Sequence, residues 1–180
     1  MFDTIGGIPL HPLIVHAVVV LVPLAALLVL ASALSATVRR WAGILTPITA
    51  TIALALVPLA TESGESLEKR VDPSPTLEEH TELGDSLVYF VLVLALAAWL
   101  LWYADRRARA TASGTTTTTE GASHAGHVAR TGLITAAMVL SVVAVLATSV
   151  QVFRIGHSGA QATWEDTGAK AVQSGGGDGD

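Results

Sequence analysis

The sequence contains no cysteine among its 180 residues. Disulfides, thiolate metal sites, iron–sulfur clusters and covalently attached c-type haem are therefore excluded. Charged residues are scarce: they make up 14% of the chain, against roughly a quarter in soluble domains, whereas hydrophobic residues make up 51%. The formal net charge of −5 gives no reason to expect nucleic acid as a partner. This composition excludes an ordinary soluble globular domain.

Long apolar segments are present instead, and they predict an all-α fold. Four segments are long enough to cross a bilayer, namely 13–35, 42–60, 86–104 and 132–153. Backbone amides in lipid must find partners within their own segment, so each segment is expected to be a helix. The sequence therefore predicts an integral membrane four-helix bundle, in which Pro23 and Pro47 bend their helices.

The remaining segments divide the chain into parts. The first part, 1–104, contains three spans and an acidic loop at 61–85. The second part, 105–131, contains a run of threonines and is expected to be a disordered cytoplasmic loop. The third part, 132–174, contains the fourth span with an outer extension, and a flexible tail at 175–180 follows it. Thr76 and Glu79 match a capping box, so the third helix is expected to begin well before its span.

Charge distribution predicts the orientation. The loops after the first and third spans hold six of the ten basic residues, which are Arg39, Arg40, Arg106, Arg107, Arg109 and Arg130. The loop 61–85 holds eight acids and only two basic residues. By the positive-inside rule, both termini and the acidic loop face the extracytoplasmic side. Four aromatic residues are expected to form an interfacial belt on the inner side, or alternatively part of the bundle core: Trp41, Trp99, Trp102 and Tyr103.

Four of the six histidines are expected at the outer ends of the helices, namely His11, His16, His80 and His157. An ionisable residue at the membrane is a functional candidate by default. His11 and His16 are separated by about 140° around a helix, so a large planar cofactor held by two imidazoles fits better than one ion held by all four. Gly156 and Gly159 would permit the close approach of a helix or a flat macrocycle. His124 and His127 are expected to be solvated in the cytoplasmic loop.

These motifs resemble those of an uncharacterised bacterial membrane family, the domain of unknown function 2231 (DUF2231). The resemblance rests on His11-Pro12 followed by His16, on His80 with Gly84 four positions later, and on Gly156-His157-Ser158-Gly159. It implies four spans over almost the whole chain and a location in a bacterial inner membrane. Some similar proteins are fused to a Rieske-type iron–sulfur domain, which implies a redox setting, although the module itself is absent here.

The leading hypothesis is a non-covalently held b-type haem, or a divalent metal ion, on the outer face in an electron-transfer role. The expected cofactor-binding residues are His11, His16, His80, His157, Gly156 and Gly159, and the metal alternative uses His16, His80 and His157. Glu79 or Glu82 is expected to accept hydrogen bonds from the ligating imidazoles. The expected partners are the lipid bilayer and a redox protein or a membrane partner subunit.

Two other classes remain open at this stage. The histidines of a non-catalytic membrane subunit or scaffold would only join helices, whereas a transporter would need polar groups through the membrane midplane. The polar residues deep in the spans are mainly threonine and serine, which ordinarily bond to a helix carbonyl. No phosphate loop, metalloprotease motif or nucleophile elbow is present, so no catalytic residue is assigned.

Overall fold

The computed structural model describes residues 4–5, 8–69, 73–113 and 120–174. Two short antiparallel strands precede the helices, with Thr4 opposite Pro9 and Ile5 opposite Ile8. The elements in chain order are β1 (Thr4–Ile5), β2 (Ile8–Pro9), α1 (Leu10–Leu34), α2 (Ala36–Ala42), α3 (Leu45–Glu68), α4 (Pro75–Ser113) and α5 (Glu120–Ser174). The fold is therefore all-α apart from this small hairpin.

Four of the described helices are long and apolar enough to cross a membrane. The candidate spans are His11–Leu34, Leu45–Glu68, Pro75–Ala110 and Gly132–Ala162. Their outward faces carry large apolar side chains such as Val20, Leu27 and Phe153, which are 63%, 64% and 73% exposed. Such a surface is stable in hydrocarbon, whereas a soluble monomer rarely exposes so much contiguous apolar area. The predicted multi-pass membrane character is confirmed.

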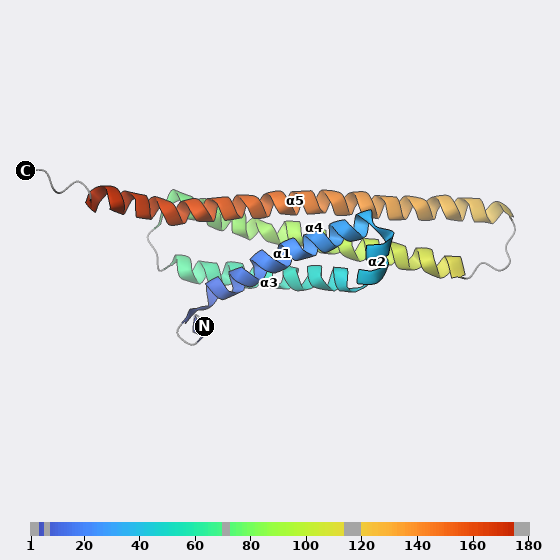
Figure 1. The fold of residues 1–180 in the computed structure, drawn as a ribbon, viewed down its shortest axis with the longest axis horizontal. Helices are drawn as coiled ribbons and strands as arrows, with labels where there is room; N and C mark the ends of the chain where they lie inside the picture. Colours follow the sequence, from blue (N-terminus) through green and yellow to red (C-terminus); the bar gives the residue numbers. More distant parts are fainter. Residues whose placement is uncertain (1–3, 6–7, 70–72, 114–119, 175–180) are drawn as a thin grey trace, which may run out of the picture.

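The four spanning helices form a bundle in which α1 packs on α3, α3 on α4, α4 on α5 and α5 on α1. Helices α1 and α4 are thus diagonal neighbours with few contacts. The start of α1, the end of α3, the start of α4 and the C-terminal part of α5 lie at one end of the bundle, and α2 lies at the other (Figure 1). We call these the histidine end, where His11 and His80 lie, and the arginine end, where Arg39 and Arg106 lie.

Small side chains allow the helices to approach closely. Ala25, Ala50, Ala53 and Ala97 are fully buried in the largest core cluster. Without a hydrophobic force between helices in lipid, such close packing and a few polar contacts hold a bundle together. One polar contact joins α5 to α4, because Gln151 Nε2 donates to the carbonyl of Leu83 at 2.9 Å and to the Oγ of Ser86 at 2.7 Å.

Most of the hydroxyl groups within the spans bond to helix carbonyls, as expected. Thr49, Thr51 and Ser141 each donate to the carbonyl four residues earlier, at 2.8 Å. Thr46 instead pairs with Ser32 across the α1–α3 contact at 3.2 Å. These hydroxyls satisfy one another or their own helix, and they do not form a polar path along the bundle.

Two local expectations need correction. Pro47 was expected to bend its helix, but it lies in the first turn of α3, where a missing N–H costs no helical hydrogen bond. The prolines inside the helices are Pro23 in α1 and Pro58 in α3. The helix of the third span does begin early, at Pro75, but its cap is Ser74, whose Oγ accepts from the backbone N–H of Leu77 at 3.2 Å. Proline is favoured directly after such a cap, which places the start of the helix before Thr76.

The expected disordered loop 105–131 is largely helical at both of its ends. Helix α4 continues to Ser113, and α5 begins at Glu120. The threonine run 115–119 and the tail 175–180 lie outside the described residues. Alanine and arginine, which are frequent at 104–113, are good helix formers and extend α4 beyond its apolar part.

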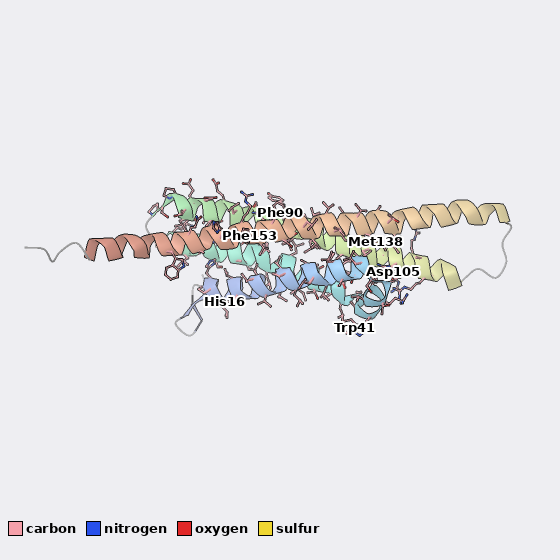
Figure 2. The ribbon with its side chains drawn as sticks, turned by 45° about the horizontal axis from the view of Figure 1, so that its top comes forward. His16, Trp41, Phe90, Asp105, Met138 and Phe153 are labelled. Atoms are coloured by element: carbon pink, nitrogen blue, oxygen red, sulfur yellow. The ribbon has the colours of Figure 1, made fainter. Side chains whose placement is uncertain are left out.

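The interfacial aromatics lie on the outside of the bundle near the arginine end. Figure 2 shows Trp41 and Asp105 there, far from His16. Trp41 is 80% exposed and Tyr103 is 46% exposed, while Trp99 donates through Nε1 to the Oγ1 of Thr51 at 3.1 Å. Outward-facing indole and phenol rings agree with a belt at the membrane surface and not with the core alternative.

Candidate functional site

His11 is held at the histidine end by α3. Its Nδ1 lies 3.2 Å from the carbonyl oxygen of Ala60 and 3.0 Å from the Oγ of Ser63. The same Ser63 Oγ donates to the Ala60 carbonyl at 2.9 Å. The ring is half-buried in the first turn of α1, where Pro12 follows it. One imidazole thus joins the start of α1 to the last turns of α3.

His80 is held in the same way by α5. Its Nδ1 lies 3.2 Å from the carbonyl oxygen of Ile155 and 3.2 Å from the Oγ of Ser158. Ser158 Oγ again donates to the carbonyl three residues earlier, at 3.1 Å. His80 lies near the start of α4, as His11 lies near the start of α1. The two arrangements therefore match atom for atom.

The glycine that follows each serine completes the match. A Cβ added at Gly64 would lie 3.1 Å from the Cε1 of His11, and a Cβ added at Gly159 would lie 2.9 Å from the Cε1 of His80. A Cβ at Gly159 would therefore force His80 to shift, and one at Gly64 would require His11 to move by a few tenths of an ångström. We call each His–Ser–Gly group a clasp: His11, Ser63 and Gly64 form the first, and His80, Ser158 and Gly159 form the second.

The clasps relate the two halves of the bundle to each other. The pair α1 and α3 corresponds to the pair α4 and α5, and the contacts of α3 with α4 correspond to those of α5 with α1. This is the pattern of two helix pairs related by an approximate two-fold axis along the bundle. Because α1 and α4 are diagonal, the two histidines come from opposite corners of the bundle.

The hydrogen bonds determine which ring nitrogen can act as a ligand. A carbonyl oxygen only accepts, so Nδ1 must carry the proton when it bonds to Ala60 or Ile155. The serine hydroxyls, which donate to the same carbonyls, are then oriented to accept from Nδ1–H. In the neutral rings, the lone pair is left on Nε2. This is the tautomer and support that a metal-ligating histidine normally has.

The other predicted histidines lie outside the clasps. His16 is exposed on α1 and its Nδ1 bonds to the carbonyl of Pro12, in its own helix. His157 is exposed on α5 and stacks on Phe153, with 6.1 Å between ring centroids. His157 is one position before Ser158, which places it about 100° around α5 from that serine. His16 is five positions after His11, which places it about 140° around α1 from that histidine.

The predicted glycines and glutamates also separate into two groups. Gly159 contacts His80, whereas a Cβ at Gly156 would meet nothing within 4 Å. Glu79 and Glu82 are exposed, and serine and carbonyl oxygens of α5 accept the hydrogen bond that these glutamates were expected to accept. Glu79 and Glu82 are one and two positions from His80, so their side chains lie about 100° or more around α4 from the imidazole. The expectation that they accept its hydrogen bond was therefore wrong.

Sequence reasoning missed Ser63, Gly64 and Ser158 as the residues that contact the two histidines. The available signal was a repeated Ser-Gly pair, Ser63-Gly64 in α3 and Ser158-Gly159 in α5. The carbonyl that each serine bonds belongs to the residue three positions earlier, Ala60 or Ile155. Within the described residues, no group of three or more His, Cys, Asp and Glu side chains could hold a metal ion. The geometry therefore centres on a pair of imidazoles.

Comparison with known proteins agrees with the motifs. The model of a family of predicted membrane proteins, DUF2231, matches residues 7–171, which include both clasps and all four spans. No curated protein matches the chain, and no solved structure does. A match over this share of the chain shows that the protein belongs to the DUF2231 family of predicted membrane proteins.

Proposed function

We propose that the imidazoles of His11 and His80 would hold a non-covalently bound b-type haem at the histidine end of the bundle. The observation that carries the proposal is the pair of clasps. Two imidazoles on diagonal helices have their Nδ1–H groups bonded identically, and this leaves Nε2 of each as the nitrogen for a metal. Haem iron can be held by two imidazoles and no other protein ligand, whereas a small metal ion usually needs three or more protein ligands.

The chain's own residues have defined roles in this proposal. Ser63 and Ser158, together with the carbonyls of Ala60 and Ile155, hold the rings in orientation and tautomer. Such supporting hydrogen bonds also raise the basicity of a ligating imidazole. A bound haem would supply one-electron chemistry, which is consistent with an electron-transfer role for a protein without other catalytic motifs.

The site is proposed to face the extracytoplasmic side of a bacterial inner membrane. The opposite end of the bundle carries Arg39, Arg40, Arg106, Arg107 and Arg109, which supports placing that end inside. A redox protein or a membrane partner subunit that delivers or accepts electrons would then approach from outside. The orientation and the cofactor are independent parts of the proposal.

The haem proposal is tested with the full-length chain purified in detergent and titrated with haemin. We expect one haem per chain, with a Soret band and reduced-state bands typical of two nitrogen ligands. His11→Ala and His80→Ala should each abolish this spectrum, whereas His16→Ala and His157→Ala should leave it unchanged, because those rings lie outside the clasps. Absence of a stoichiometric Soret band in the wild-type protein would refute the proposal.

A supporting variant separates ligation from folding. Ser158→Ala keeps the imidazole but removes one acceptor of Nδ1–H, and loss of such a support typically weakens binding about 10–100-fold. If no haem or divalent metal binds, and His11→Ala and His80→Ala only destabilise the helices, the clasps are structural. That outcome establishes the second candidate function, a non-catalytic scaffold subunit, which is favoured by the direct bonds of both rings to neighbouring helices.

A further inference from the structure

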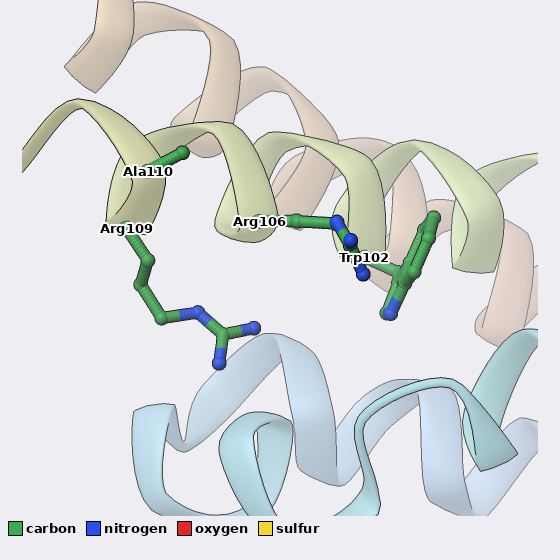
Figure 3. Close-up of a pocket in the computed structure, with 4 residues that line it drawn as sticks. All are labelled: Trp102, Arg106, Arg109 and Ala110. Carbon is green, nitrogen blue, oxygen red and sulfur yellow. The ribbon is translucent and has the colours of Figure 1, made fainter.

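The arginine end contains a surface pocket on one side of α4. It is lined by Trp102, Arg106, Arg109 and Ala110 (Figure 3). Arg106 lies beside Trp102, with its Cζ 5.4 Å from the ring centroid, while Arg109 extends toward the segment around the end of α1 and α2. Two guanidinium groups and an indole ring therefore surround one opening.

Among the described residues, Asp105 is the carboxylate that pairs with the pocket's Arg109. Asp105 is buried, and its Oδ1 accepts from Arg39 Nε at 3.1 Å while its Oδ2 pairs with Arg109 Nη2 at 2.6 Å. Arg39 also donates through Nη1 to the carbonyl of Ser32 at 2.6 Å. One carboxylate thus faces two guanidinium groups, and Arg106 adds a third positive charge at the rim. The local field favours an anion.

The position of the pocket indicates what kind of anion it meets. Trp102 and Tyr103 end the apolar part of α4, and the preceding outward side chains are apolar, with Leu96 58% and Trp99 38% exposed. Aromatic residues of this kind lie at the level of the lipid headgroups. The pocket therefore opens at the height of phosphates, directly beside a surface that acyl chains cover.

We propose that this pocket binds the phosphodiester headgroup of an anionic phospholipid. Arg106 and Arg109 would donate to the phosphate oxygens, for which the planar guanidinium fork is well suited. Trp102 would lie against the glycerol region, and the face of α4 around Trp99, one helical turn before Trp102, would contact the acyl chain. The charge of the pocket and its apolar neighbour together favour a lipid over free phosphate. This inference is independent of the haem proposal.

The test measures lipid binding to the full-length protein in a neutral detergent, by native mass spectrometry and by thermal unfolding with added lipid. We expect phosphatidylglycerol to bind and to raise the melting temperature, because a ligand of the native state stabilises it. Phosphatidylcholine and inorganic phosphate should do so at least tenfold more weakly. Arg106→Gln should lower the affinity for phosphatidylglycerol by about tenfold, as for loss of one charge-assisted contact.

Arg107→Gln is the matched control, since it removes the same charge one position away. Arg107 lies over Tyr103, at 5.4 Å, and not in the pocket, so its variant should bind phosphatidylglycerol like the wild type. Arg106 is exposed, so its substitution should leave the fold intact. Equal losses in the two variants would mean general surface charge and would overturn the proposal, as would equal binding of phosphatidylcholine or of inorganic phosphate.

Discussion

Single glycine residues determine how closely the two histidines can approach their neighbouring helices. At Gly64 and Gly159 the imidazole carbon occupies the space that a Cβ would need, at 3.1 Å and 2.9 Å. At Gly156, three positions from Gly159 on the same helix, that space is open. Two glycines in one short motif therefore have different reasons to be present, and only one of them belongs to a clasp.

Gly159→Ala is predicted to destabilise the protein. The new methyl group would displace His80 and weaken its bonds to Ile155 and Ser158, and overpacking of this kind typically costs about 1–3 kcal/mol. Gly156→Ala should be neutral or stabilising by up to about 1 kcal/mol, because alanine is the better helix former. Thermal unfolding of both variants in detergent, followed by circular dichroism, measures the difference. Equal stability of the two variants would contradict the clasp geometry.

At the scale of elements, the two ends of the bundle are closed by different chemistry. Histidine–serine hydrogen bonds join the helices at the histidine end, whereas an ion pair joins α2 to α4 at the arginine end through Arg39 and Asp105. Helix α2 has only seven residues, capped by Ser35, and is too short to be stable alone. Its position on the bundle therefore depends on the bonds that Arg39 makes to Asp105 and to the end of α1.

Asp105→Asn is predicted to destabilise this end of the molecule. It leaves the guanidinium of Arg39, which is 92% buried, without its counterion, and breaking a buried pair costs about 3–5 kcal/mol. Arg40→Gln alters the neighbouring exposed arginine and should change stability by less than about 0.5 kcal/mol. Thermal unfolding and limited proteolysis after Arg39 and Arg40 would report the loss. A melting temperature equal to that of Arg40→Gln would show that the ion pair contributes nothing.

At the scale of the whole molecule, the spans were predictable and the clasps only partly so. Hydropathy and the pairing rule for backbone amides in lipid are sufficient to place four helices. His11 and His80 were among the predicted residues because an ionisable side chain at the membrane is a functional candidate by default. Their partners Ser63 and Ser158 are 52 and 78 positions away, and the choice of partner depends on which helix faces meet. Packing sets those faces, and local sequence does not encode them.

The orientation of the bundle is predicted to place the arginine end inside the cell. The chain has no cysteine, so single cysteines can be introduced without background labelling. Lys69→Cys lies just after α3 at the histidine end and Ala110→Cys lies on α4 at the arginine end, and both positions are exposed. In intact bacterial cells, a membrane-impermeant maleimide should label the cysteine at 69 and reach the cysteine at 110 only after lysis. The reverse pattern would place both clasps on the cytoplasmic side, and any electron partner would then have to approach from there.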